Sequence, residues 1–359
     1  MRVRREDDRG ALGVLISILL GFGVLLGMGA IVIDVGFLYQ ERAELQNGAD
    51  AGALAVAQTC AKAPCLVNKS NYFANQNARD TVSTVDAVCG FDKGGTLPSC
   101  PASTGRMTDC PAKPAAGTTY VDVHTSTQTS GGGTLLPPVF ARALLGNESY
   151  EGSRVIACAR AQWGPPKTAK TMAMTISWCE WSQATSGGTS YGPQPPTTPP
   201  LSVHRVLKLH TTSSTTTCPS GPAGSDGPGM FGWVDDTNSD CSVFISNNTY
   251  SANTGASADK DCKSALQDAF ASREPVFFPI YTKVTGTGTG GTYTLAGFAA
   301  FVVTGYWLPG ANQKDWLTGK NECKGSDKCV AGYFVQALMP NEGTIGGPDL
   351  GVRIVQLTG

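Results

Sequence analysis

Residue types that carry out chemistry in proteins are sparse in this chain, apart from cysteine. The 359 residues include only three histidines but twelve cysteines. His204 and His210 are six positions apart, so on a strand they would share a face, but no cysteine or carboxylate lies nearby in sequence to complete a metal site. No two cysteines have the C-x-x-C spacing typical of zinc or redox sites. The sequence therefore predicts neither a metal site nor a bound cofactor.

One glycine-rich string resembles a phosphate-binding loop only superficially. The string runs from Gly286 to Gly291, but no lysine follows it and a strand is expected next. A phosphate-binding loop needs a lysine and the start of a helix, so that backbone amides and an ammonium group converge on the phosphate. With only three histidines for acid–base work, we expect no catalytic residues and a protein that is not an enzyme.

The cysteines instead predict disulfides in an oxidising compartment. Six precede Gly164 and six follow it, at positions 60, 65, 89, 100, 110 and 158, then 179, 218, 241, 262, 323 and 329. An even number on each side of Gly164 predicts that no bridge joins the two sets. Six cysteines allow 15 pairings, and spacing singles out only Cys323 with Cys329, as a small loop between strands.

The elements that position these residues begin with an apolar segment. Ala11 to Ile33 contains no charge, and its 23 residues would form a helix of roughly 34 Å, enough to cross a bilayer. Arginines 2, 4, 5 and 9 precede it, which predicts a cytoplasmic tip of residues 1–10 and places all later residues outside the cytoplasm. A cleavable signal is the alternative, but its apolar region would be shorter. We expect a single-pass cell-membrane protein whose later domains face outward.

The helix is predicted to continue to about Ala57 as one rod of roughly 70 Å. A stripe of large and small residues follows one side of it, formed by Leu38, Leu45, Ala49, Gly52 and Val56. Within the apolar segment, Gly23 and Gly27 have the spacing that lets two helices approach closely. We interpret these seven positions as a helix assembly face. The alternative is that the stripe packs beneath the protein's own head.

The same segment resembles the N-terminal part of TadE/TadG-like proteins, which are accessory, pilin-like components of Flp (Tad) pilus assembly. The resemblance covers residues 9–58 and rests on the apolar run, Asp34-Val35-Gly36, Leu38-Tyr39, Glu44-Leu45-Gln46-Asn47 and the alanine-rich residues 49–55. A looser similarity continues through residues 120–123, 138–142 and 153–161. The resemblance implies pilus or pseudopilin subunits and secretion machinery as partners, besides the lipid membrane.

One departure concerns processing. Type IV pilins are cut after a glycine and usually carry Glu five residues after that glycine. The corresponding cleavage in this chain would fall between Gly10 and Ala11, and Leu15 stands at the glutamate position. Without that carboxylate nothing would offset a buried terminal amine, so a major filament subunit is disfavoured.

The rest of the chain predicts an α+β fold. We expect a TadG-like α+β domain over residues 58–163 and a mostly-β domain over 164–359, with a Ser/Thr/Pro-rich loop near 182–200. Strands are predicted at 276–284, 292–307, 333–338 and 352–357, and a helix at 259–273. The second domain resembles the extracytoplasmic region of a group of actinobacterial Tad-associated membrane proteins. A formal net charge of -1 argues against nucleic acid as a partner.

The sequence thus predicts a membrane-anchored minor pilin or pseudopilin that acts through protein contacts. The alternative is an anchored adhesion or ligand-binding protein at the cell surface. Exposed tryptophans would favour the alternative and buried ones a scaffold; those concerned are Trp178, Trp181, Trp233, Trp307 and Trp316.

Overall fold

The computed structural model describes most of the chain and divides it into two compact units. The described residues are 8–21, 24–102, 109–142, 149–209, 218, 231–236, 238–253, 260–286, 291–325, 327–340 and 342–359. The first unit comprises Met1–Cys60, Cys65–Gln162 and Leu357–Gly359, and the second comprises Ala61–Pro64 and Trp163–Gln356. Both units mix helix with sheet, and the second is mostly β, as the α+β prediction requires.

The N-terminal segment is helical, but the structure describes two helices where one unbroken rod was predicted. They are α1 (Asp8–Gly21) and α2 (Val24–Lys62), and Phe22 and Gly23 lie outside the described residues. Helix α2 also runs past the predicted end at Ala57, because its breaker comes only at Pro64. The residue before a proline avoids helical angles, and Ala63 has a φ of 47°. Within the described residues, we find no helix with both the length and the apolarity to span a bilayer.

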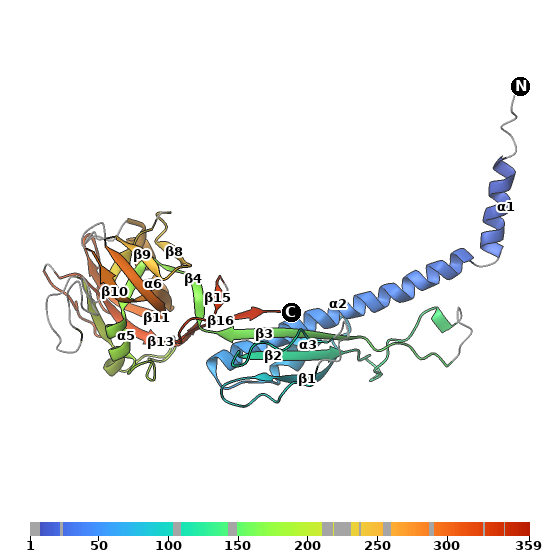
Figure 1. The fold of residues 1–359 in the computed structure, drawn as a ribbon, viewed down its shortest axis with the longest axis horizontal. Coiled ribbons are helices and arrows are strands. Elements are labelled where there is room, and N and C mark those ends of the chain that lie inside the picture. Colours follow the sequence, from blue (N-terminus) through green and yellow to red (C-terminus); the bar gives the residue numbers. More distant parts are fainter. Residues whose placement is uncertain are drawn as a thin grey trace, which may run out of the picture. The chain divides into compact units, whose positions relative to one another are not determined.

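The first unit contains an antiparallel meander with α2 packed against it (Figure 1). After α3 (Lys69–Asn77), the strands follow in chain order as β1 (Thr84–Phe91), β2 (Tyr120–Ser126) and β3 (Ile156–Gly164). Strand β2 pairs with β1 from Thr84↔Ser126 to Phe91↔Tyr120, and with β3 from Tyr120↔Gln162 to Ser126↔Ile156.

Contacts between α2 and this sheet are both apolar and polar. Leu45 packs in a small core with Val155 and Ala157 at the start of β3. The Thr125 hydroxyl donates to the carbonyl oxygen of Leu45 at 3.0 Å, and the Gln46 amide donates to the carbonyl oxygen of Cys158 at 3.0 Å. These two hydrogen bonds satisfy polar groups at the contact between α2 and the sheet. A polar group buried there without a partner would lower the stability of the fold.

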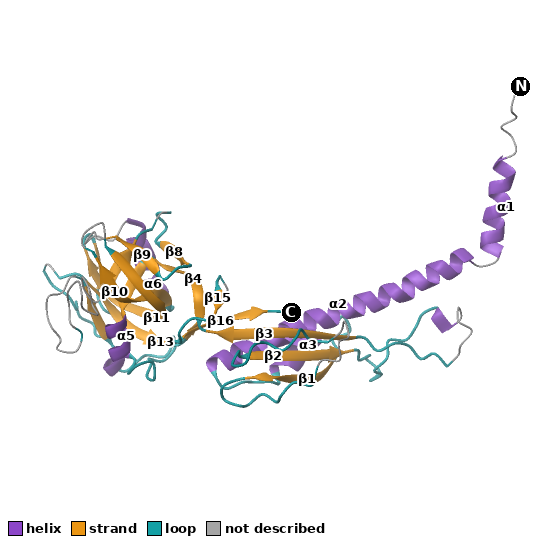
Figure 2. Cartoon of the chain, viewed as in Figure 1, coloured by secondary structure: helices purple, strands orange, loops and turns teal. Residues whose placement is uncertain are grey.

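The second unit is built on a larger sheet and a smaller one (Figure 2). The eight-stranded sheet has the order β10-β5-β7-β9-β11-β13-β6 with β12 beside β11, and β10 also pairs with β11, so the pairing path returns on itself. The three-stranded sheet has the order β15-β4-β8, and β14 pairs in parallel with β16. The bounds are β4 (Pro166–Met172), β5 (Met174–Ser177), α5 (Trp178–Ala184), η1 (Leu201–Val203), β6 (Arg205–Lys208), β7 (Phe231–Val234), β8 (Ser242–Ile245), β9 (Thr249–Asn253), α6 (Lys260–Ser272), β10 (Val276–Thr285), β11 (Thr292–Leu308), β12 (Ala311–Gln313), β13 (Cys329–Val335), β14 (Ala337–Leu338), β15 (Thr344–Ile345) and β16 (Val352–Leu357).

Strands β10, β11 and β16 and helix α6 confirm the strands and helix predicted from sequence, within a residue or two at each end. The predicted strand 333–338 is instead β13 followed by β14, and residues 287–290 of the glycine-rich string lie outside the described residues. Helix α5 was not predicted. Its signal was Ser177, whose hydroxyl accepts from the Glu180 amide at 3.1 Å as an N-cap.

All twelve cysteines form disulfides, three on each side of Gly164. The pairs are 60–65, 89–100, 110–158, 179–218, 241–262 and 323–329. None joins the cysteines before Gly164 to those after it. Such a set is expected of a protein that folds in an oxidising compartment.

Candidate assembly site on the N-terminal helices

The large-and-small stripe of α2 is buried in the first unit. Leu45 is 3% exposed, and Ala49 and Val56 are fully buried at 0%. Leu38, one end of the stripe, is half-buried and packs on the Leu45 core. Of the two roles considered for the stripe, packing beneath the protein's own head is the one that the structure shows for these residues.

Glycine allows the close approach between α2 and α3. A Cβ added at Gly52 would lie 3.3 Å from the Ser70 Cα, and one added at Gly48 would lie 3.1 Å from the Ala74 Cα. These are backbone atoms, which cannot move aside as a flexible side chain would. Of the predicted pair in the apolar segment, Gly27 is half-buried on α2 and Gly23 lies outside the described residues.

The part of the N-terminal helices that precedes the head presents a different surface. From Leu12 to Tyr39 the described side chains are mostly apolar and exposed, the largest fractions being 71% at Val32 and 72% at Tyr39. The exposed apolar residues are Leu12, Val14, Leu15, Ile16, Ile18, Leu20, Met28, Ile31, Val32, Ile33, Val35, Phe37 and Tyr39. We call these thirteen residues the exposed apolar segment. Exposed apolar surface of this extent marks a contact with lipid or protein.

Asp34 connects the exposed apolar segment to a distant loop. Its carboxylate accepts hydrogen bonds from three consecutive backbone amides: Val139 at 2.9 Å, Phe140 at 3.1 and 3.2 Å, and Ala141 at 2.6 Å. The two sequence motifs that resemble the TadE/TadG-like family, at 34–36 and 138–142, therefore bind each other. Their contact was not predictable from local pattern, because more than one hundred residues separate the two motifs.

Gly10 and Ala11 lie in α1, where Gly10 is exposed and a Cβ added there would meet nothing within 4 Å. Cleavage between these two residues stays a prediction.

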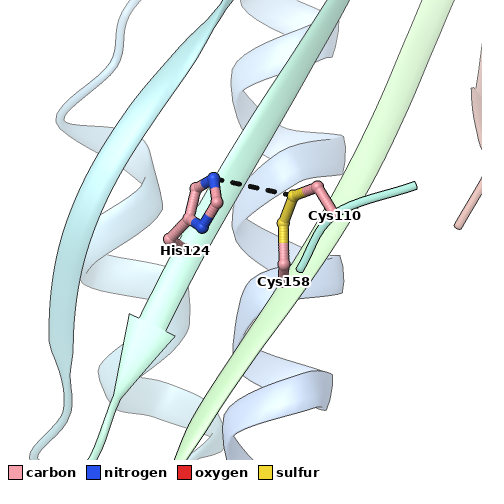
Figure 3. Close-up of side chains that lie close together, drawn as sticks. All are labelled: Cys110, His124 and Cys158. Atoms are coloured by element: carbon pink, nitrogen blue, oxygen red, sulfur yellow. Dashed lines mark hydrogen bonds between the residues drawn. A yellow bond between two sulfur atoms is a disulfide. The ribbon is translucent and has the colours of Figure 1, made fainter. Parts of the chain in front are cut away.

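Three groups of histidine, cysteine and carboxylate side chains lie close together in the described part of the chain, and two of them contain a histidine. In the first unit, Nε2 of His124 lies 3.6 Å from Sγ of Cys110, which is bonded to Cys158 (Figure 3). Sulfur atoms joined in a disulfide are not the thiolates that bind metals. The histidine therefore packs over a disulfide that fastens the Cys110 segment to β3.

In the second unit, His204 has the carboxylate partner that its sequence neighbourhood lacked. Nε2 of His204 lies 2.7 Å from Oδ2 of Asp315, which also accepts from the Thr304 hydroxyl at 2.7 Å. Glu322 lies within the same cluster and accepts from the Thr318 hydroxyl. These donors and acceptors satisfy one another within the fold. His210 lies outside the described residues.

Hydrogen bonding controls the charge of Asp315. Burial alone would raise the pKa of this carboxyl, but hydrogen bonds from His204, Thr304 and the backbone amides of Thr318 and Leu317 hold its pKa below the usual value. Asp315 is only 1% exposed, so these donors take the place of water around its carboxylate.

The G-x-S-x-G spacing of hydrolase nucleophile elbows occurs at Gly188-Thr189-Ser190-Tyr191-Gly192. That elbow requires a strand before the serine and a helix after it. Here the helix α5 comes first and an irregular turn carries Ser190, whose amide bonds back to the Thr185 carbonyl oxygen at 2.8 Å. The motif's structural context is therefore missing.

The tryptophans are mostly enclosed. Trp181 and Trp233 are 2% and 3% exposed, whereas Trp178 reaches 36%. Trp307 and Trp316 are half-buried, and the Arg273 guanidinium lies 4.7 Å from the Trp316 ring centroid. These five rings do not form the exposed aromatic cluster expected of a ligand-binding surface.

The N-terminal helices are similar to one known protein family. Residues 13–59 match the family model described as putative Flp pilus-assembly TadE/G-like. This match agrees with the resemblance found over residues 9–58 and covers most of α1 and most of α2. No curated protein matches the chain, and no solved structure matches it. The resemblance of the second domain to actinobacterial Tad-associated proteins stays a prediction.

Proposed function

We propose that this chain is a pilin-like component, of the minor pilin or pseudopilin type, of a Flp (Tad) pilus assembly apparatus. The observation that carries the proposal is the division of the family-matched helix α2. Its later part is buried beneath the head, whereas its earlier part belongs to the exposed apolar segment. A helix fixed to a head at one end and exposing apolar side chains at the other is suited to helix–helix assembly.

We further propose that residues 11–33 anchor the chain in the cell membrane and that both units lie outside the cytoplasm. The support is the run of 23 uncharged residues, the four arginines before it and the six disulfides after it. The chain acts in this proposal through contacts with pilus subunits and secretion machinery rather than through catalysis. The buried tryptophans do not favour the adhesion alternative.

The test compares exposed aromatic residues on two parts of the first unit. Each variant is expressed in a strain from which the native protein has been deleted. The double variant Phe37→Ala/Tyr39→Ala should leave protein abundance unchanged but reduce the pilus count severalfold. Phe37 and Tyr39 are 43% and 72% exposed, so truncating them removes contact surface without opening the core.

The matched control is Phe91→Ala/Tyr72→Ala, because those side chains are 43% and 61% exposed but lie on β1 and α3. This control should retain normal pili. Normal piliation in the strain that lacks the chain altogether would reject the assembly role.

A further inference from the structure

The loop that Asp34 holds presents apolar side chains to solvent. Val139 is 55% exposed and Phe140 is 41% exposed, and both come directly after the half-buried Pro138. Their backbone amides are fixed on the Asp34 carboxylate. The loop backbone is thus held beside α2, with the Phe140 side chain exposed. Figure 1 shows this segment, between β2 and β3, leaving the sheet and running alongside α2.

The position of the contact along α2 indicates what the loop meets. Asp34 is the first charged residue after the uncharged run of residues 11–33. The loop is therefore held at the level where the apolar anchor ends. Ile33 and Val35, which flank Asp34, are 43% and 41% exposed. Phe140 thus extends an apolar surface that is already present on the helix.

Residues just beyond Asp34 have the character of a membrane interface. Phe37 and Tyr39 lie three and five positions later, a rise of about 4.5 to 7.5 Å along the helix. The headgroup layer is about 5 to 7 Å deep on each side of the hydrocarbon core, and aromatic residues are enriched there. Arg142, an exposed cation at the end of the loop, suits the phosphates of that layer.

The Asp34 carboxylate is also compatible with this location. A carboxylate at the edge of a bilayer is costly unless hydrogen bonds replace its water. Three amide donors supply those hydrogen bonds. The same interaction satisfies three backbone N–H groups that would otherwise face lipid headgroups.

We propose that residues 138–142 form a second, interfacial membrane contact, held by Asp34, that seats the first unit on the outer surface of the bilayer. The occupant is the lipid interface and not a protein. This inference rests on the membrane anchor of the proposed function. It adds a second contact with the membrane, because residues 11–33 could anchor the chain without the loop.

The experiment places a photo-crosslinker at Phe140 in the full chain. The chain is reconstituted into vesicles of phosphatidylcholine and phosphatidylglycerol, with p-benzoylphenylalanine in place of Phe140 or, as the matched control, in place of Phe91. Phe91 is 43% exposed on β1, against 41% for Phe140, so both probes are equally available to reagents. Mass spectrometry after irradiation should find lipid adducts at position 140, at least tenfold more than at position 91.

A second variant tests the role of Asp34. Asp34→Ala removes the acceptor for all three amides, so the lipid adduct at position 140 should fall severalfold while the chain still floats with the vesicles. A chain that floats but gives no lipid adduct at position 140 overturns this inference alone. An adduct between position 140 and another protein chain overturns it as well. Failure of the unmodified chain to float refutes the anchor and this inference together.

Discussion

Asp34 and Asp315 illustrate how single carboxylates organise this protein. Each accepts several hydrogen bonds, from residues 139–141 in the first case and from His204 and Thr304 in the second. Residues 139–141 and His204 are more than one hundred positions away from the carboxylates that they bind. Hydrogen bonds to a charged acceptor are stronger than neutral ones. A carboxylate with several donors therefore fixes the position of a loop or strand end that has little apolar packing of its own.

The Asp315 cluster predicts a defined pH dependence. Because the folded-state pKa of Asp315 lies below its unfolded value of about 3.9, the unfolded state binds the proton first as pH falls. Its contribution to stability is therefore complete above about pH 4 and is lost as pH falls through the folded pKa. Asp315→Asn should lower the free energy of unfolding by about 1 to 3 kcal/mol at pH 7, and this deficit should shrink below pH 4.

Tryptophan fluorescence during urea unfolding measures this effect, because all six tryptophans, from Trp163 onward, belong to the second unit. Asp327→Asn is the control, since Asp327 is 51% exposed and pairs with Lys208 only at the surface. It should cost less than about 1 kcal/mol. A deficit for Asp315→Asn that stays constant down to pH 2 would contradict the prediction.

At the scale of elements, α2 serves two purposes along its length. The apolar residues before the head are exposed, whereas Leu45, Ala49 and Val56 are buried against the sheet and its neighbours. Alternation of glycine and alanine with leucine lets α3 approach closely at Gly48 and Gly52. The later part of α2 thus contributes buried side chains to the core of the first unit, whereas its earlier part presents exposed apolar side chains.

Added bulk at Gly52 should therefore destabilise the first unit. Gly52→Leu would force atoms into the backbone of α3 at Ser70, at a cost of about 1 to 3 kcal/mol. Amide hydrogen exchange of β1 to β3 should accelerate, and protein abundance should fall before pilus number does. Gly36→Leu, on the same helix with nothing within 4 Å, should leave exchange unchanged. Wild-type exchange in Gly52→Leu would show that α3 does not pack there.

At the scale of the whole molecule, charge and disulfides predict its orientation. Alkaline phosphatase, which is active only outside the cytoplasm, should be active when fused after Gly359 and inactive when fused before Met1. The physical reason is that the arginines before Ala11 stay on the cytoplasmic side, whereas disulfides form on the other side. Activity of the fusion before Met1, with none after Gly359, would reverse the orientation.

The sequence by itself determined the features that depend on local pattern. Strands β10, β11 and β16 and helix α6 follow from periodicity and β-branched or aromatic content, because neighbouring residues decide those elements. The N-terminal resemblance was equally local, since its motifs lie within one helix-forming segment. The N-cap at Ser177 was also local, and its helix α5 could have been predicted from it.

Only the tertiary structure decided which partners those elements have. The sequence left the stripe of α2 between two roles, because an apolar face has the same pattern whether it meets its own head or another chain. The Asp34 contact spans 105 to 107 residues and the His204–Asp315 pair spans 111. Such pairs are invisible in sequence because chain folding alone brings them together, after which short hydrogen bonds with specific geometry hold them.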